Sequence, residues 1–219
     1  MNLSKETLSK LKNFAEINNN LLVTKGNRIK TVNASKSLLG ETVITESFDV
    51  DEFGFYDLNE FLGILSLFEE PSLEFSDKSV TVSDGKSSVK YFSASKEILV
   101  YPNRDIIFPE PDIEFQLNAD LVNTIRKVSS VLNASNISII GDGDEIKVNI
   151  GDVKNATAPA YSSVVGTTDK VFTAILKVDH FKLMPGAYTV SLSKKKISKF
   201  TNGDNVYYLA VEADSKFEF

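Results

Sequence analysis

The sequence contains no Cys, no Trp and a single His, His180. Without Cys there are no disulfide bonds, no thiol nucleophile and no zinc or iron–sulfur site built on thiolates. A lone His excludes His-rich metal centres, so we expect neither a metal nor another cofactor. Long apolar runs are also lacking, because the longest, 61–68, is far too short to span a membrane. The N-terminus lacks the basic-then-apolar pattern of a signal peptide. We therefore expect a cytoplasmic protein without a membrane partner.

What is present is an ordinary globular composition with an acidic balance. The chain has 219 residues, of which 42% are hydrophobic and 25% charged, and its formal net charge is -6. That length supports one large domain or two smaller ones, each with a real core. The net charge argues mildly against a simple nucleic-acid-binding domain, because such domains usually carry a basic footprint.

Proline marks the middle of the chain. Only 6 Pro residues occur, and three of them fall within 102–111. A Pro-punctuated, extended stretch is typical of a linker. The sequence therefore predicts an N-terminal domain over 1–102, a connector over 103–111 and a C-terminal domain over 112–219.

Four segments have the apolar spacing of amphipathic helices. They are 4–17, 57–68, 118–132 and the short 178–184, which ends at Pro185-Gly186. Ser4 and Asn118 are expected N-caps, and Asp57 with Glu60 forms a capping-box pattern.

Most of the remaining chain alternates like β-strands, with turn pairs between them. Expected turns are 83–85, 142–144 and 202–204, and 25–27 is expected to divide a hairpin within 21–32. The four helix starts, near residues 4, 57, 118 and 178, are 53, 61 and 60 residues apart. This recurrence predicts a fourfold repeat of one helix followed by an antiparallel meander, two units in each domain. The predicted class is α+β, with the helices of both similar domains packed on antiparallel sheets.

Several segments resemble a known family, the sliding clamps that act as DNA polymerase processivity factors in T4-like bacteriophages. The resemblance rests on four segments, which are Leu11-Lys12-Asn13-Phe14-Ala15-Glu16-Ile17-Asn18, Tyr56-Asp57-Leu58-Asn59-Glu60-Phe61-Leu62-Gly63-Ile64-Leu65-Ser66-Leu67, Met184-Pro185-Gly186-Ala187-Tyr188 and Ala210-Val211-Glu212-Ala213-Asp214-Ser215. They are spread over the whole chain. The less familiar stretches, 36–50, 93–105 and 152–170, are expected to be loops or divergent strands.

The resemblance implies a non-enzymatic protein that forms a closed ring of three subunits, a homotrimer with the DNA clamp fold. Double-stranded DNA would pass through the ring without being read, in the cytoplasm of the infected bacterial host. The DNA polymerase would be tethered to the ring, and an ATP-dependent clamp loader would open it. Late-transcription factors are further partners that the resemblance implies. The chain has no G-x-x-x-x-G-K-[ST] loop, so it is not itself the motor.

The polar face of the predicted helix 118–132 is the main candidate for contacting DNA. It carries Asn123, Arg126, Lys127 and Ser130. One interpretation is a solvated polar face, as on any amphipathic helix. The other is a phosphate-facing surface, with Arg and Lys for charge and Asn and Ser for weak hydrogen bonds. The resemblance favours the second.

Other basic residues are weaker candidates for the same role. Lys5 and Lys12 lie on the first predicted helix, and Lys177 and Lys182 flank the fourth. Over 4–17, 57–68, 118–132 and 177–183 we count 7 basic and 6 acidic residues, a net charge of +1. The remainder has 24−7=17 basic and 30−6=24 acidic residues, a net of -7. The sign of this contrast fits an acidic ring with positive residues turned inward.

Three features with chemical potential have plainer explanations. Asp179 and His180 are adjacent in a predicted helix, so their side chains diverge by about 100° and do not form a catalytic pair; a His at the surface or at the rim is expected. Residues 142–145 resemble a fragment of a calcium loop but are better explained as a hairpin turn. The lysine run 194–196 is either a solvated turn or a DNA contact.

Apolar residues also occur where exposure is expected. Ile106, Ile107 and Phe108 lie in the connector, and Phe217 and Phe219 end the sequence. They either pack locally on a sheet or form a pocket for a partner peptide.

Two rival functions remain open from the sequence. One is a phage structural or assembly protein of repeated β-meanders without DNA binding. The other is a single-strand binder, which would need aromatic stacking platforms in a basic groove.

Overall fold

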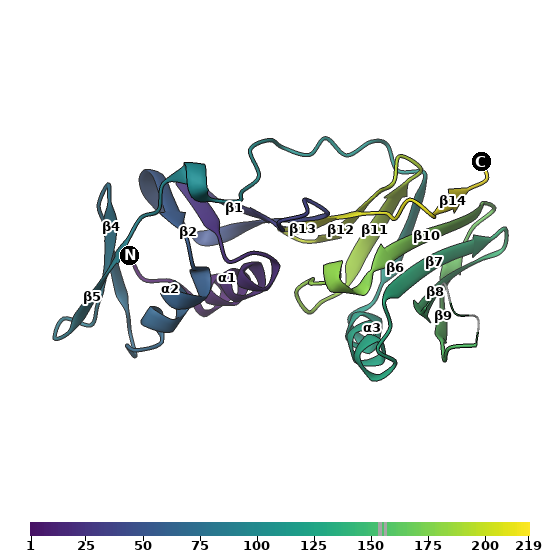
Figure 1. The fold of residues 1–219 in the computed structure, drawn as a ribbon, viewed down its shortest axis with the longest axis horizontal. Helices are drawn as coiled ribbons and strands as arrows, with labels where there is room; N and C mark the ends of the chain where they lie inside the picture. The colour runs from purple at the N-terminus through teal and green to yellow at the C-terminus, as the bar shows by residue number, and fades with distance from the viewer. Residues whose placement is uncertain (153–154, 156) are drawn as a thin grey trace. The chain divides into compact units, whose positions relative to one another are not determined.

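The computed structural model describes residues 1–152, 155 and 157–219. They form two compact units, Met1–Asp105 and Ile106–Phe219. Each unit combines α-helix with antiparallel β-strands, as the α+β prediction requires (Figure 1).

The first unit has two α-helices and two groups of strands. Its elements in chain order are α1 (Lys5–Ile17), β1 (Leu21–Val32), β2 (Leu38–Phe55), α2 (Leu58–Leu65), β3 (Ser72–Phe75), β4 (Ser79–Ser83), β5 (Ser88–Phe92) and the 3-10 turn η1 (Lys96–Ile98). β1 pairs with β2, and the order of the other group is β3-β4-β5. α1 packs against β2 and α2.

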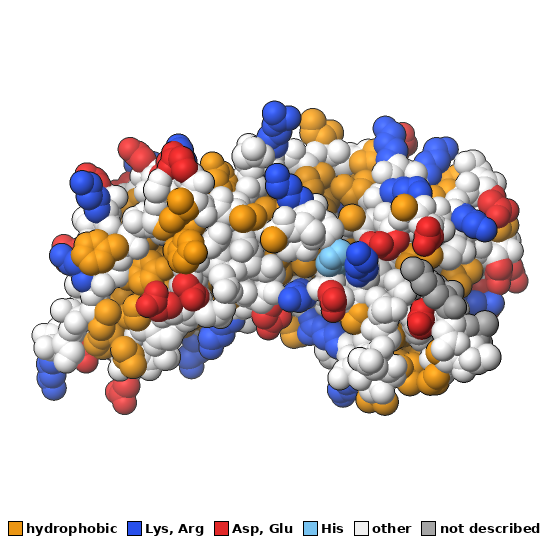
Figure 2. Space-filling view, in the orientation of Figure 1, with side chains coloured by type: hydrophobic (Ala, Val, Ile, Leu, Met, Phe, Trp, Pro, Cys, Tyr) orange, Lys and Arg blue, Asp and Glu red, His pale blue; other side chains and the backbone are white. Residues whose placement is uncertain are grey.

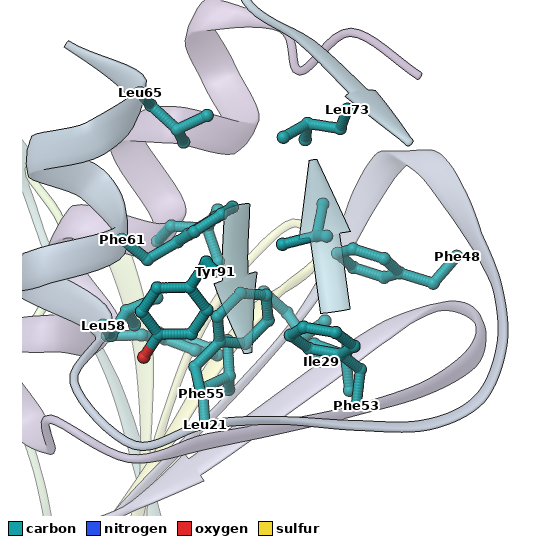
Figure 3. Packing of buried hydrophobic residues seen from close by; sticks show 14 of the residues in the cluster. Leu21, Ile29, Phe48, Phe53, Phe55, Leu58, Phe61, Leu65, Leu73 and Tyr91 are labelled. Carbon is teal, nitrogen blue, oxygen red and sulfur yellow. The ribbon is translucent and has the colours of Figure 1, made fainter. Parts of the chain in front are cut away.

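Aromatic rings dominate the core of this unit (Figure 3). The ring of Phe55 on β2 lies 4.5 Å from that of Phe61 on α2, and Tyr91 on β5 completes the group at 5.6 Å from Phe61. Because each buried aromatic side chain removes a large apolar area from water, this contact fixes α2 against both groups of strands.

The expected hairpin within 21–32 is wrong, because those residues form the single strand β1. Gly26, with φ of 115°, occupies an irregular point in the ladder instead of a turn. Thr24 pairs with Glu52 and Arg28 pairs with Val43, so ten residues of β2 lie opposite five of β1. The true turn follows Val32, where Asn33 Oδ1 accepts hydrogen bonds from the backbone nitrogens of Ser37 and Leu38.

The second unit has one α-helix and two sheets. Its elements are β6 (Ile113–Leu117), α3 (Ala119–Val131), β7 (Asn136–Asp142), β8 (Glu145–Gly151), β9 (Tyr161–Thr167), β10 (Val171–Lys177), the 3-10 turn η2 (Val178–His180), β11 (Tyr188–Ser193), β12 (Ile197–Asn202), β13 (Asn205–Ala210) and β14 (Lys216–Phe217). The strand orders are β6-β11-β12-β13 and β14-β10-β7-β8-β9.

The sheet β14-β10-β7-β8-β9 has two distinct faces. Ile139, Val148 and Ala174 are almost fully buried in the core, on the side against which α3 packs through β8. Their chain neighbours point to the other face, because side chains alternate along a strand. We call this the outward face of the sheet.

The fourth predicted helix, 178–184, is wrong. Only the 3-10 turn η2 forms there, and Phe181 has left helical geometry with ψ of 55°. A seven-residue helix adds few hydrogen bonds to repay its costly first turn, and Pro185 disfavours helical geometry at the residue before it.

The predicted caps and most predicted turns are confirmed. Ser4, Asp57 and Asn118 each accept hydrogen bonds at a helix start. Only half of the capping box forms, because the Asp57 backbone nitrogen donates to the Tyr91 hydroxyl. The turns at 83–85, 142–144 and 202–204 each join paired strands.

The turn between β7 and β8 accounts for the acidic run at 142–145. Asp142 Oδ1 accepts hydrogen bonds from the backbone nitrogens of Asp144 and Glu145, at 3.1 and 2.8 Å. These bonds, together with Lys147, lower the pKa of Asp142 to about 2. The carboxylate therefore serves the hairpin, as the turn interpretation predicted.

Candidate nucleic-acid interface

The exposed face of α3 carries three of the predicted DNA-facing residues. Asn118 fixes the start of the helix, since its Oδ1 accepts from the Leu121 backbone nitrogen at 2.8 Å. Val122 and Ile125 are buried against the sheet. Asn123, Lys127 and Ser130 follow one another at i, i+4 and i+7 and are exposed. The structure thus brings these three side chains to one surface.

Arg126 occupies a different position on the same helix. Its side chain is half-buried and lines a hollow of about 300 Å³ together with Ser129, Ser130 and Phe181. Burial raises the pKa of Tyr188 to about 12, and the positive charge of Arg126 acts in the opposite direction. Arg126 therefore lies close enough to Tyr188 for its positive charge to act on the core of this unit.

Two neighbours on this face were not recognised in the sequence. Asp120 is exposed three residues before Asn123, and Val131 is exposed over 82% of its surface. Helical spacing was the signal that would have found both. At its two ends this face is therefore less basic and more apolar than the four predicted DNA-facing residues of α3 suggest.

The lysines of α1 differ sharply in exposure. Lys5 and Lys12, seven residues apart, are exposed on one side of the helix. Lys10 is only 4% exposed; its Nζ donates to the Val43 carbonyl at 2.8 Å and pairs with Glu6 at 2.7 Å. Lys10 thus fastens α1 to β2, and the exposed pair remains available to solvent.

Lys177 and Lys182 are not placed alike. Lys177 ends β10 on the outward face of the sheet, away from α3, and its Nζ lies 3.7 Å from Glu212. Lys182 is half-buried just after η2, near the hollow beside α3. The structure therefore does not gather these two lysines with Lys127 on one surface.

The expectation of a surface histidine is wrong. His180 is 9% exposed, because η2 turns its side chain inward. Burial lowers the pKa of His180, and the positive charge of Lys177 lowers it further against the opposing effect of Glu212. A neutral, buried imidazole at neutral pH belongs to the packing of this unit.

The predicted partner-pocket residues divide between two places in the second unit. The Phe108 ring lies 6.2 Å from Tyr208 on β13, Ile106 is half-buried and Ile107 is 93% exposed. Phe217 on β14 stacks on Phe172 of β10 at 6.2 Å, with an interplanar angle of 6°. These ring contacts agree with local packing for Phe108 and Phe217 and leave Ile107 as an exposed apolar side chain.

The lysine run and the last residue lie together. Lys170 Nζ and Lys194 Nζ stand 4.9 and 5.5 Å from the centre of the Phe219 ring. Lys194 also pairs with Asp112 at 3.8 Å, and Lys196 donates to the Ala213 carbonyl. Lys195 is exposed, and a DNA contact by this run remains a prediction.

The charged side chains on the drawn face are mixed in sign. Lys and Arg are interspersed with Asp and Glu on the face drawn in Figure 2, instead of forming a continuous basic surface. Within the described residues, no group of three or more His, Cys, Asp or Glu is arranged to hold a metal ion. Over the same residues, no helix has the length and apolar character needed to cross a membrane.

Comparison with curated proteins decides the family. The chain is 33% identical to the sliding clamp of Escherichia phage RB69 over 230 aligned residues, covering 100% of both chains. The chain belongs to the sliding clamp family. It is also 31% identical to the clamp of Enterobacteria phage T4 and 29% identical to that of Vibrio phage KVP40, over 100% and 97% of this chain. No family model matches the sequence.

Solved clamp structures share the fold at much lower identity. A chain of A. fulgidus PCNA, solved with the C-terminal region of FEN-1 bound, matches with a TM-score of 0.70 and 12% identity over 98% of both chains. The Bartonella birtlesii polymerase III β subunit matches with a TM-score of 0.72 and 14% identity, over 97% of this chain and 64% of that one. The predicted family and clamp fold are confirmed. As a sliding clamp of phage origin, the protein acts in DNA replication, and the structural-protein alternative is not favoured.

Proposed function

We propose that this clamp encircles duplex DNA as a closed homotrimer and tethers the replicative DNA polymerase without catalysing a reaction. Full-length identity of 33% to a phage sliding clamp is the observation that carries the proposal. Tethering holds a dissociated polymerase at high effective concentration near its template. An ATP-dependent clamp loader opens the ring, the site of action is the cytoplasm of the infected bacterium, and late-transcription factors are further partners.

Self-association is supported by the edge of one sheet. Among the described residues, β9 pairs with β8 on one side only and ends the strand order β14-β10-β7-β8-β9. Val164 on β9 is more than half exposed. An unpaired edge with an exposed apolar side chain is a template for a strand of another subunit.

The surface proposed to meet DNA comprises Lys5, Lys12, Asn123, Arg126, Lys127, Ser130, Lys177 and Lys182. Lys127 is the strongest member, because it is exposed beside Asn123 and Ser130 on the well-capped helix α3. Few, exposed and salt-sensitive phosphate contacts permit sliding, whereas base-specific contacts would hinder it. Lys177, paired with Glu212, is the weakest member.

The connector over 103–111 is proposed to join the two clamp domains, 1–102 and 112–219, and to bind partners. Ile107 is its exposed apolar anchor, next to the half-buried Ile106 and Phe108. Phe217 and Phe219 are proposed to belong to the same partner site.

Retention on closed circular DNA tests the main proposal. Clamp loaded on a nicked circle is expected to stay bound until the circle is linearised, and Lys127→Glu is expected to leave the circle several-fold faster in about 0.15 M salt. Lys216→Glu makes the same charge change on β14, the edge strand at the opposite end of the order β14-β10-β7-β8-β9 from β9. It is the matched control. Equal retention on circular and linear DNA, or a monomer in size-exclusion chromatography, would contradict encirclement.

A further inference from the structure

The segment that follows β13 lies along the outer edge of β10 (Figure 1). Residues 212–219, which we call the tail, contribute the two-residue strand β14 to this edge, whereas β10 pairs with β7 along the whole of Val171–Lys177. Among the described residues, β7 and β14 are the only strands beside β10. Because a two-residue pairing adds little stability, we expect the tail to detach far more easily than the rest of the sheet opens.

Hydrogen bonds to main-chain groups of β10 attach the tail. The Glu212 backbone nitrogen donates to the Ile175 carbonyl at 2.8 Å, and the Glu218 backbone nitrogen donates to the Val171 carbonyl at 3.0 Å. Ser215 Oγ accepts from the Ile175 backbone nitrogen at 2.9 Å, and Ser215 is the one buried residue of the tail. Because the β10 side of each bond is main chain, another extended segment with a hydroxyl or carbonyl in place of Ser215 can form the same set.

Two aromatic rings supply further contacts of the tail. Phe217 stacks on Phe172. The Phe219 ring lies within cation–π distance of the ammonium groups of Lys170 and Lys194. Phe219 is nevertheless 39% exposed. Two cations around one surface ring, next to a stacked pair of rings, make a seat for aromatic side chains and favour an acidic residue between them over a basic one.

We propose that the tail covers a docking site for an extended partner segment with two aromatic residues on either side of an acidic one, and that such a segment displaces the tail on binding. The first aromatic side chain of the partner stacks on Phe172, the second replaces Phe219 beside the two lysines, and the partner backbone pairs with the edge of β10. The free chain thus shields the site until a competing segment is present. This inference deepens the partner role proposed for Phe217 and Phe219, on which it rests.

Binding of the tail sequence in trans tests the proposal. The probe is a fluorescein-labelled peptide, Glu-Ala-Asp-Ser-Lys-Phe-Glu-Phe. The receptors are the full-length wild type and full-length Phe217→Ser with Phe219→Ser, whose own tail is a weaker competitor. Fluorescence anisotropy is expected to show binding to the variant about tenfold tighter than to the wild type, because the intact tail competes at high effective concentration. Absence of saturable binding to the variant, or equal affinity for both receptors, overturns the proposal.

Changes in the probe and in one lysine define the chemistry of the site. A probe with Lys in place of its second Glu, or with Ser in place of both Phe, is expected to bind about tenfold more weakly. In the Phe217→Ser with Phe219→Ser background, Lys194→Gln is expected to weaken binding several-fold, whereas Lys195→Gln, an exposed neighbour with the same charge change, leaves it unchanged. Equal losses in both lysine variants would reduce the effect to general charge attraction and overturn the docking site.

Hydrogen exchange at the Ile175 amide, which donates to Ser215 Oγ, reports whether the edge of β10 is covered. Exchange is expected to be about tenfold faster in the double variant than in the wild type and to slow again with saturating probe, while the Val148 amide on β8 keeps its wild-type rate. A probe that binds without slowing exchange at Ile175 binds elsewhere, which overturns the proposal. If Val148 also exchanges faster, the unit has opened, and Phe219→Ser alone serves as the receptor for the same measurements.

A second copy of the chain is the competing occupant. The double variant is expected to have the same mass by light scattering as the wild type. If its mass is lower, the tail joins copies of the chain and the displacement proposal is wrong. None of these measurements involves DNA, so their failure leaves encirclement standing, and loss of retention on nicked circles with intact probe binding would do the reverse.

Discussion

The Glu46 carboxylate on β2 accepts a hydrogen bond from the Thr7 hydroxyl in the first turn of α1. A second hydrogen bond comes from the Ser4 backbone nitrogen at the N-cap. Burial acts to raise the pKa of Glu46, but these hydrogen bonds outweigh it and leave the pKa below its usual value. The Glu46 carboxylate therefore accepts hydrogen bonds from two donors at the start of α1 and fixes the position of that helix on β2.

Glu46→Gln is expected to reduce the free energy of unfolding by about 1 kcal/mol, because a neutral amide is a weaker acceptor at a helix N-terminus. Denaturant titration at pH 7 checks this, with Asp51→Asn on the exposed part of β2 as the control. Because the folded pKa is depressed, the stabilisation is present above about pH 4.5 and is lost as the pH falls further. An unchanged difference between wild type and Glu46→Gln down to pH 3 would contradict this role.

His180 predicts a different pH dependence. Burial, the first cause, lowers its folded pKa below the unfolded value of about 6.5, so the unfolded state takes up the proton first. Stability is therefore expected to fall as the pH drops below about 6.5. The charged groups around the imidazole are Lys177, Lys182, Asp179 and Glu212.

Thermal melts between about pH 7.5 and 5 test the His180 prediction. His180→Asn is expected to lower the midpoint at pH 7.5 but to flatten its dependence on pH. If the wild type and His180→Asn lose the same number of degrees over this range, another group is responsible.

Substitution by Ala is expected to have opposite effects on stability at two glycines, Gly141 and Gly63. A Cβ on Gly141 would meet the Phe172 ring at 2.3 Å, so Gly141→Ala is expected to destabilise the second unit by about 1–3 kcal/mol. Gly63, in the interior of α2, has open space around it, so Gly63→Ala is expected to stabilise by about 0.5–1 kcal/mol. Chemical denaturation compares both with the wild type, and equal effects would refute the argument.

Loss of a side-chain hydrogen bond to Val100, in the segment before residue 103, is expected to change hydrogen exchange locally. Asn20 Oδ1 accepts from the Val100 backbone nitrogen at 2.9 Å, and Asn18 Nδ2 donates to the Val100 carbonyl at 2.7 Å. Asn20→Ala is expected to speed hydrogen exchange at the Val100 amide by about tenfold, with Asn27→Ala as the exposed control. Exchange that stays at the wild-type rate would show that these bonds do not hold the segment.

Helical spacing and turn chemistry accounted for most of the fold that was predictable. Apolar periodicity predicted the helices α1, α2 and α3. The residue types of Ser4, Asp57 and Asn118 predicted their N-caps. Turn chemistry failed at Gly26, because a glycine with positive φ serves a strand irregularity as well as a hairpin. Periodicity failed at 178–184, where the apolar positions belong to a 3-10 turn and the strands around it.

The candidate site was less predictable than the fold. Exposure of Asn123, Lys127 and Ser130 followed from the helix pattern. Partial burial of Arg126, burial of Lys10 and the pairing of Lys177 with Glu212 did not, because each depends on neighbours distant in sequence.

In the paired strands β1 and β2, ten residues of β2 lie opposite five residues of β1. This stretch of β2 therefore contains residues that are not needed for strand pairing. Residues can be gained or lost between Val43 and Phe48 while the pairs on either side keep their register. Evolution can therefore alter the length of this stretch more freely than that of its neighbours, provided that a carboxylate still reaches the start of α1.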